Sequence, residues 1–144
     1  MRVAKVRPVK TPARGTPQSA GLDFFVPDGV HFTVQPGTSA LIPSGIKVSV
    51  PKGHALVAFN KSGIATKRSL IVGACVVDED YQGEIHLHLM NVGQEPQEIN
   101  AGDKITQFVL LPVLYDGVEV VEPSSLYEQA TVRGNGAFGS TGVR

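Results

Sequence analysis

The feature that most constrains the fold of this chain is a series of closely spaced turn signals. Short segments that contain glycine, most of them with proline as well, occur at residues 27–29, 35–37, 43–45, 51–53 and 100–102. The chain has 16 glycines and 10 prolines among its 144 residues. Their combined share is larger than the roughly 12% that is usual in proteins. Turns this close together leave room for short strands, so the spacing predicts an antiparallel β-sandwich or barrel.

Between the turns, three segments alternate apolar and polar residues. These segments are 30–34, 46–50 and 85–89. A period of two is typical of strands with one buried face. Continuous apolar runs at 70–77 and 108–114 indicate strands buried on both faces, either in the core or against a neighbouring subunit. A helix is predicted only at 124–131, where Ser125 and Glu128 have the spacing of a capping box.

Charge and cysteine content exclude several classes of protein. Thirteen basic and thirteen acidic residues give a formal net charge of 0, so no global field attracts nucleic acid or an acidic membrane. Only 18% of the residues are charged, which favours self-association. The single cysteine, Cys75, excludes an internal disulfide and a Cys-based zinc site. Neither a signal-peptide pattern nor a membrane-spanning stretch is present, so we expect a soluble, cytoplasmic protein.

The segment 133–142 is rich in glycine and contains Arg133, Phe138, Ser140 and Thr141. Glycine N–H groups, hydroxyls and an arginine together suit phosphate oxygens. It is not a Walker loop, because Ser140 stands where the lysine belongs and the chain ends before a helix can follow. A frayed terminus is the alternative explanation. Phe138 favours binding, because an aromatic ring in a polar tail can stack on a base.

Three consecutive acids, Asp78, Glu79 and Asp80, follow an apolar run that ends at Val77. A solvated hairpin loop is the simplest explanation for such a cluster. Asp78 differs from its neighbours because it directly follows Val77, so we expect it to be partly desolvated and to hold its proton more tightly. That tuning suits a general base.

Other polar residues allow two interpretations each. Residues 60–68 place three cations and two hydroxyls between apolar segments, which suits a phosphate-facing loop or a solvated face. Asp23 lies between apolar residues, where a carboxylate needs a cation or a donor. His86 and His88 share a strand face, and without a third ligand nearby a solvent-facing or interface position is favoured over a metal site.

Five polar or glycine-containing segments follow one another along the chain: 20–23 (AGLD), 61–65 (KSGIA), 76–83 (VVDEDYQG), 102–107 (GDKITQ) and 133–142 (RGNGAFGSTG). Taken in this order, they resemble the motifs of the homotrimeric all-β deoxyuridine triphosphatases, the dUTPase family. Any one of them alone is weak evidence, whereas five in order along one domain are specific.

The resemblance implies a jelly-roll trimer that hydrolyses dUTP to dUMP and pyrophosphate, which limits uracil in DNA and supplies dUMP for thymidylate synthesis. Each active site would then be assembled from all three chains. Asp78 would activate the water that attacks the α-phosphorus, and Asp23 would hold a hydrated Mg2+ ion through water. Tyr81 would pack beneath the deoxyribose and exclude a 2′-hydroxyl.

The resemblance also implies a set of substrate-binding residues. Gly73 and Ala74 would read the uracil edge through backbone groups, and Phe138 would stack on the base. The phosphates would be bound by the remaining members of the set, which are Lys61, Ser62, Gly63, Gln107, Arg133, Gly139, Ser140 and Thr141. The single domain is then expected to consist of a β-barrel, residues 1–132, and a mobile glycine-rich arm, residues 133–144.

Three residues depart from the family pattern. Lys61 replaces the usual arginine, which exchanges a planar fork of donors for a point charge. Cys75 and Ala137 replace common glycines, so the local backbone must differ wherever the family needs a positive φ.

Two other functions fit parts of the same pattern. A deoxycytidine triphosphate deaminase shares the fold implied here but uses a glutamate base, and it would release ammonia from dCTP. A catalytically silent β-sandwich binding module would instead recognise a partner independently of nucleotide.

Overall fold

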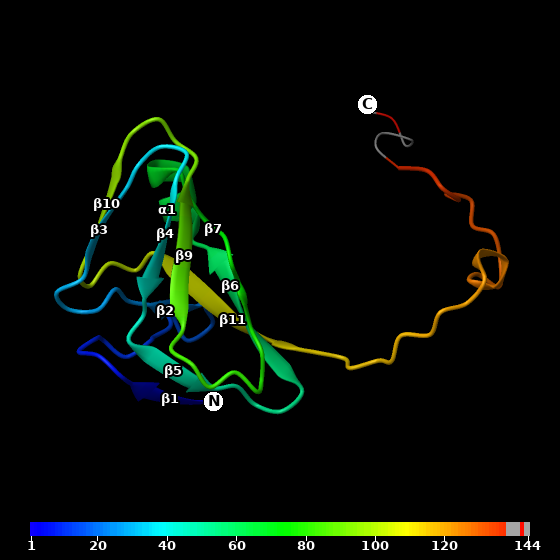
Figure 1. Cartoon of the computed structure of the whole chain (residues 1–144), viewed down its shortest axis with the longest axis horizontal. Helices are drawn as coiled ribbons and strands as arrows, with labels where there is room; N and C mark the ends of the chain where they lie inside the picture. The colour runs from blue at the N-terminus through cyan, green and yellow to red at the C-terminus, as the bar shows by residue number, and fades with distance from the viewer. Residues whose placement is uncertain (138–141, 143–144) are drawn as a thin grey trace. The chain divides into compact units, whose positions relative to one another are not determined.

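The computed structural model describes residues 1–137 and residue 142. The chain forms two compact units, Met1–Leu114 and Tyr115–Arg144. The strands and the α-helix of the described residues all lie in the first unit (Figure 1). Among its described residues, the second unit contains one short 3-10 helix, η1 (Pro123–Ser125).

The strands are short, as the spacing of the turns predicts. In chain order they are β1 (Arg2–Lys5), β2 (Leu22–Phe24), β3 (His31–Val34), β4 (Ser39–Pro43), β5 (Ile46–Ser49), β6 (His54–Asn60), β7 (Leu70–Val72), β8 (Val76–Val77), β9 (His86–Asn91), β10 (Gln97–Asn100) and β11 (Thr106–Pro112). They form sheets in the orders β1-β5, β10-β3, β2-β11-β6-β8 and β4-β9-β7. The pairings are antiparallel, so the predicted all-β, jelly-roll-like antiparallel fold is confirmed.

The predicted turns are also confirmed, because each contains a glycine in the left-handed region that other residues avoid. These glycines are Gly29 (φ 73°), Gly37 (φ 73°), Gly45 (φ 71°), Gly53 (φ 73°) and Gly102 (φ 82°). The three alternating segments become β3, β5 and β9, with bounds shifted by one or two residues.

Both predictions of burial on two faces are wrong for the chain by itself. In the run 108–114, Leu111, Pro112 and Leu114 are exposed. The apolar run 70–77 does not form one strand buried on both faces, because it divides into β7 and β8 around an exposed stretch. Ala74, Cys75 and Val76 are exposed, and Val76 has 59% of its surface accessible. Strand β8 lies at the edge of its sheet and so has a strand neighbour on one side only.

The helix predictions also need correction. Segment 124–131 contains only the end of η1, whereas a seven-residue helix that the pattern did not indicate, α1, spans Ser62–Arg68. Helix α1 buries none of its residues, so it carries no apolar stripe to reveal it. The basic side chains of Lys67 and Arg68 in its last turn interact favourably with the negative end of the helix dipole. Ser69 ends the helix in the left-handed conformation (φ 50°).

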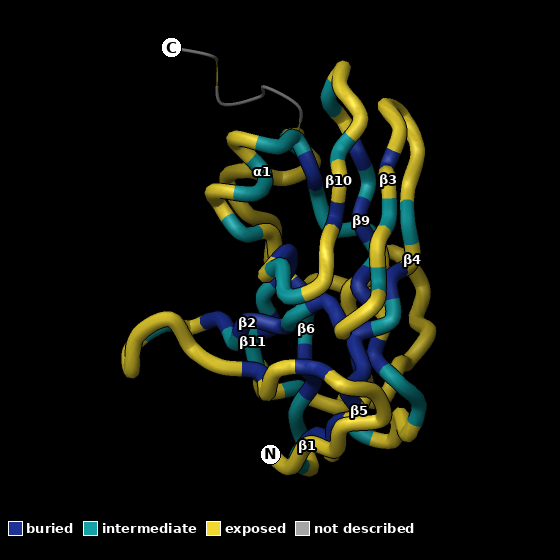
Figure 2. The backbone as a smooth tube through the Cα atoms, turned by 90° about the vertical axis from the view of Figure 1, so that its left-hand side faces the viewer, coloured by how far each residue is buried: buried dark blue, intermediate teal, exposed yellow. Residues whose placement is uncertain are grey.

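The core lies between the strands of the first unit, and along strands such as β5 and β9 buried residues alternate with less buried ones (Figure 2). The rings of Phe24 on β2 and Phe108 on β11 pack with centroids 4.4 Å apart. This contact holds β2, which carries Asp23, firmly against β11, which carries Gln107. Among the described residues, no helix is long and apolar enough to cross a membrane.

Candidate functional site

Asp23 is the buried acid of the first unit, with 6% of its surface accessible. Its Oδ1 atom forms an ion pair with Lys61 Nζ, and its Oδ2 atom lies 3.6 Å from Lys104 Nζ. The cation that a carboxylate between apolar residues requires is therefore present, and a second one stands beside it. Lys104 was not among the predicted site residues.

Gln107 lies next to this pair because it is opposite Asp23 in the β11–β2 register. Its amide Nε2 donates to the Asn60 carbonyl over 2.8 Å. A Cβ atom added to Gly21 would lie 1.9 Å from Gln107 Oε1, so only glycine permits this packing. The structure thus brings the first, second and fourth motifs together.

Ser62 and Gly63 open helix α1, directly after Lys61. Both residues are exposed. The Ser62 carbonyl accepts a hydrogen bond from the Thr66 hydroxyl over 2.7 Å, so the backbone of this exposed residue is held by the helix. Together with Asp23, Lys61, Lys104 and Gln107, these residues form what we call the cationic edge.

The third motif lines a different cleft, of about 170 Å³. The lining residues are Leu41, Ala74, Cys75, Val76, Val77, Asp78, Tyr81, Ile85, His86 and Phe108. Most of them are apolar, and Asp78 is the acid among them. We call this group, with the adjoining Gly73, the apolar edge.

Tyr81 is held over a glycine in this cleft. Its hydroxyl donates to the Glu84 carbonyl over 2.9 Å. A Cβ atom on Gly83 would lie 2.3 Å from the Tyr81 hydroxyl oxygen, so a side chain there would displace the ring. With 44% of its surface accessible, Tyr81 still presents a face to a ligand.

Gly73 and Ala74 are fixed by a residue that the sequence analysis did not place in the site. The Gly73 N–H donates to the His88 carbonyl over 3.0 Å, and the Ala74 N–H donates to His88 Nδ1 over 2.8 Å. No short motif signals this contact, because it depends on how β7 and β9 pair.

The expected desolvation of Asp78 is not provided by its own chain. Asp78 is exposed, whereas its neighbour Glu79 is half-buried and accepts a hydrogen bond from the Gly53 N–H over 2.5 Å. The reason is the position of β8 at a sheet edge, which leaves the residue after Val77 open to solvent.

A charge pair anchors the hairpin that follows Tyr81. Arg7 donates two hydrogen bonds to Glu84, Nε to Oε1 over 2.8 Å and Nη2 to Oε2 over 3.1 Å. The same Oε1 accepts the Gly45 N–H over 2.8 Å. The hydrogen bonds from Arg7, with a smaller contribution from Gly45, hold the pKa of Glu84 below its ordinary value against the opposing effect of burial.

The donor atoms of the described residues do not fit a resident metal ion held by this chain alone. No cluster of three His, Cys, Asp or Glu side chains exists among them. Both carboxylate oxygens of Asp23 already face lysines, and His88 Nδ1 already accepts a backbone N–H. One carboxylate with two ammonium groups instead suits an anion.

The two edges lie at opposite sides of one sheet. In the order β2-β11-β6-β8, Asp23 is on one outer strand and Asp78 directly follows the other. Three strand spacings of about 4.8 Å separate these strands by about 14 Å. The structure therefore assembles each group of predicted residues but does not bring the two groups together within one chain.

The predicted tail residues are described only in part. Arg133 Nε donates to the Gly136 carbonyl over 3.0 Å within the second unit. Four of the predicted residues, Phe138, Gly139, Ser140 and Thr141, lie outside the described residues.

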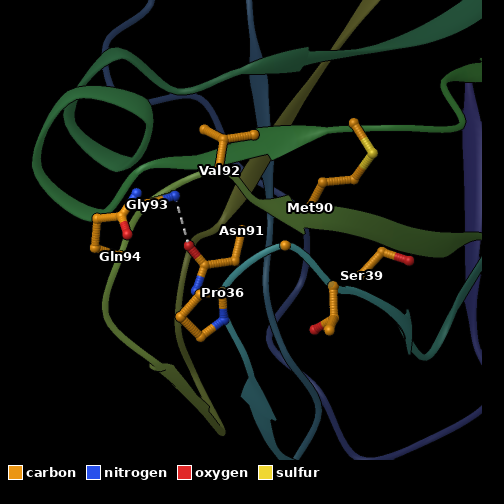
Figure 3. Close-up of a pocket in the computed structure, with 9 residues that line it drawn as sticks. Pro36, Ser39, Met90, Asn91, Val92, Gly93 and Gln94 are labelled. Carbon is orange, nitrogen blue, oxygen red and sulfur yellow. Dashed lines mark hydrogen bonds between the residues drawn. The ribbon is translucent and has the colours of Figure 1, made fainter.

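A larger hollow, of about 570 Å³, contains none of the predicted residues (Figure 3). It lies between the β3–β4 turn and the end of β9, and its lining residues carry no charge. Asn91 shapes it: its side-chain Oδ1 accepts the Gly93 N–H over 2.9 Å, and its Nδ2 donates to the Val34 carbonyl over 2.8 Å. These contacts satisfy the amide, so Asn91 has a structural role here.

Comparisons with known proteins identify the family. The dUTPase family model matches residues 7–142. The deoxyuridine 5′-triphosphate nucleotidohydrolase of Rhizobium rhizogenes is 39% identical over 99% of this chain and 92% of its own, and that of Mus musculus is 37% identical over 91% of this chain and 77% of its own.

Solved structures agree on the fold. The dUTPase of Staphylococcus bacteriophage 80alpha with dUPNHPP has a TM-score of 0.88 and 22% identity, over 99% of this chain and 98% of that one. A dUTPase of phage phi11 of S. aureus, described with a structural Mg(II) ion, has a TM-score of 0.77 and 22% identity, over 84% of this chain and 95% of that one. With a matching family model and relatives this similar over nearly its whole length, the chain belongs to the dUTPase family.

Proposed function

We propose that this protein hydrolyses dUTP to dUMP and pyrophosphate, which limits uracil in DNA and supplies dUMP. The observation that carries the proposal is the presence of two edges with complementary chemistry, one cationic and one apolar with an acid. The triphosphate of a nucleotide needs cations, and its nucleobase and sugar need an apolar cleft. The two edges together therefore match one deoxynucleotide. Family membership and relatives named for this activity support the assignment.

On the apolar edge, Asp78 is proposed to take the proton of the water that attacks the α-phosphorus. An exposed carboxylate at the mouth of a cleft can reach a water on a bound ligand. Tyr81 would pack beneath the deoxyribose and leave no room for a 2′-hydroxyl. Gly73 and Ala74 would read the uracil edge through their backbone.

On the cationic edge, Lys61, Ser62, Gly63 and Gln107 are proposed to bind phosphate oxygens. Lys61 is already held by Asp23, which fixes the direction of its ammonium group and lowers the entropy lost on binding. As a point charge it would contact one phosphate oxygen at a time, in contrast to an arginine fork.

We further propose that the protein works as a homotrimer whose sites are shared between chains. The separation of Asp23 from Asp78 within one sheet supports this, because a site complete in one chain would need both at one edge. Exposed apolar side chains offer surface to bury between subunits: Leu41 and Val92 are each 58% accessible and Val76 is 59% accessible.

Mg2+ is proposed to arrive with the triphosphate, as part of the substrate, and to contact Asp23 only through water. This agrees with a donor set that does not hold an ion by itself. When bound, the ion would neutralise phosphate charge and align the reacting groups.

Residues 133–144 are proposed to act as an arm that completes the site. Phe138 would stack on uracil, and the phosphates would be covered by Arg133, Gly139, Ser140 and Thr141. Residues 1–132 would then be sufficient for the barrel and its assembly. Deleting 133–144 is expected to abolish turnover and leave the trimer intact, as measured by light scattering.

Complementation between two inactive variants tests the whole proposal. Chains with Asp78→Asn and chains with Lys61→Met are each expected to lose dUTP hydrolysis. Because an intact site needs Asp78 from one chain and Lys61 from another, mixed and reassembled trimers should regain about a quarter of the wild-type sites. Pyrophosphate release is the measurement, with the double variant as a control that stays inactive. No recovery in mixed trimers would refute shared sites, and an inactive wild-type protein would refute the activity itself.

A further inference from the structure

We infer that His88 is the residue that positions the base-recognising backbone and selects uracil over cytosine, by accepting the Ala74 N–H at Nδ1. The inference rests on the proposed function, in which Gly73 and Ala74 meet the base. His88 is not proposed to touch the substrate, so it is a positioning residue.

Both backbone N–H groups of this short segment are held by the same residue. The Gly73 N–H donates to the His88 carbonyl over 3.0 Å, and the Ala74 N–H donates to the His88 ring over 2.8 Å. The first bond is an ordinary backbone contact that any residue at 88 would make. The second needs an acceptor at the position of Nδ1, so it depends on the side chain.

The ring of His88 lies directly against Gly73. A Cβ atom on Gly73 would lie 2.2 Å from Nδ1 and 2.5 Å from Cε1, closer than such atoms approach in proteins. The imidazole therefore reaches the Ala74 N–H only because residue 73 has no side chain. Gly73 and His88 form one unit that sets the path of the chain into the cleft.

The segment is held at both ends by other contacts. The Val72 N–H donates to Asn60 Oδ1 over 2.7 Å, and the Cys75 carbonyl accepts the Ala58 N–H over 2.7 Å. His88 supplies the contact in the middle. Losing it would leave the ends in place and free the Ala74 peptide to rotate, so the expected effect is on recognition more than on folding.

This arrangement decides which groups the segment offers to a base. With both N–H groups engaged, Gly73 and Ala74 present carbonyl oxygens, which accept hydrogen bonds. Uracil has a donor at N3, whereas cytosine has an acceptor there, so a carbonyl at this point attracts the first and repels the second. A released Ala74 N–H would be a donor able to pair with cytosine N3.

The contact also requires the ring to be unprotonated at Nδ1. Strands β4 and β7, the neighbours of β9, carry no titratable side chain, and segment 73–75 contributes only Cys75. On β9 itself the other titratable group is His86, whose Nδ1 lies 3.0 Å from the Glu84 carbonyl. A proton on Nδ1 would set two N–H groups against each other, so the contact uses Nδ1 as an acceptor.

The test compares two substitutions at His88 in the full-length protein. His88→Asn keeps an acceptor oxygen near the position of Nδ1, whereas His88→Leu removes the acceptor. We expect the KM for dUTP to rise about tenfold in H88L with little change in kcat, and to remain within about threefold of wild type in H88N. The ratio of kcat/KM for dCTP to that for dUTP should rise in H88L only. His54→Leu, on another strand, is the matched control.

The change in preference between dUTP and dCTP and the rescue by H88N are readouts that a merely structural role would not move. Thermal unfolding identifies a variant that fails to fold. If H88L misfolds, His88→Gln, which places its oxygen near Nε2, replaces it as the variant without the acceptor.

Three outcomes would overturn the inference while leaving dUTP hydrolysis in place. They are an unchanged dUTP KM in H88L, an H88N variant as impaired as H88L, and an unchanged preference between dUTP and dCTP. A wild-type protein that does not hydrolyse dUTP would instead contradict the proposed function, so the two failures are distinguishable.

Discussion

The cationic edge and the apolar edge of the same sheet differ in how their charges are satisfied. On β2, the carboxylate of Asp23 is buried and faces two lysines of its own chain. Beside β8, Asp78 is exposed in a cleft lined mainly by apolar side chains. The first edge is electrostatically complete without a partner, whereas the second is not enclosed by its own chain.

This difference indicates that the two edges have different tasks, anion binding at the cationic edge and proton abstraction at the apolar edge. A group of fixed charges prepares the cationic edge for an anion before it arrives. An exposed acid beside apolar surface becomes a useful base only after something covers it. We therefore expect assembly and substrate to act mainly on the apolar edge.

The largest expected effect is on that edge. Asp78→Asn should lower kcat by roughly 10²–10⁴-fold, because the amide cannot take the proton of the attacking water. Nucleotide affinity should be retained, as measured by calorimetry with a non-hydrolysable dUTP analogue. Asp80→Asn, in the same loop and also exposed, is the control and should hydrolyse dUTP normally. Near-full activity of D78N would remove Asp78 from the mechanism.

Metal removal tests whether the cationic edge holds a resident metal ion or is complete without one. A chelator is expected to lower dUTP hydrolysis by at least about tenfold, because Mg2+ accompanies the triphosphate. The melting temperature without nucleotide should stay unchanged, since no ion is needed to hold Asp23. A clear drop in melting temperature on chelation would contradict the interpretation that lysines alone satisfy this carboxylate.

Thr106 tests the packing beside the cationic edge. Its Oγ1 is buried and has no hydrogen-bond partner among the residues that the structure describes, although Thr106 lies opposite Phe24 and Asn60 in the sheet. Thr106→Val replaces the hydroxyl with a methyl group of similar shape and should raise the free energy of unfolding by about 1 kcal/mol. Thr106→Ser, which keeps the hydroxyl and loses the methyl, should lower it. Urea denaturation measures both, and a destabilised T106V would show that the hydroxyl has a partner in the assembled protein.

The smallest effect is expected at the Arg7–Glu84 ion pair, which anchors the hairpin after Tyr81. Since the hydrogen bonds from Arg7 hold the pKa of Glu84 below its ordinary value, the carboxylate stabilises the fold at pH values above the pKa of the unfolded chain. That contribution is lost as the pH falls through the folded-state pKa. Glu84→Gln should therefore lower the melting temperature at pH 7 and converge with the wild type in acid. Curves that remain parallel would contradict a charge effect.

Much of the fold follows from local sequence. The five turn glycines and the period-two segments predict where the strands begin and end, because a positive φ and an alternating surface are local requirements. Asp23 illustrates the same principle in the site: a carboxylate between apolar residues demands a cation, and the structure supplies Lys61.

The residues that were not predicted depend on pairing over long distances. Lys104 reaches Asp23, and His88 reaches Ala74, only after strands far apart in sequence are aligned. The exposure of Asp78 follows from the place of β8 in the sheet order, which no local pattern reveals. Helix α1 was missed because it buries nothing and so leaves no periodic apolar trace.

The placement of the two edges on opposite outer strands has a genetic consequence under the proposed assembly. Each polypeptide would contribute its cationic edge to one pocket and its apolar edge, with Asp78, to another. A copy defective at both edges would then damage two pockets of the three, and a copy defective at one edge would damage one, so inactive alleles should interfere with the healthy gene product when both are expressed together.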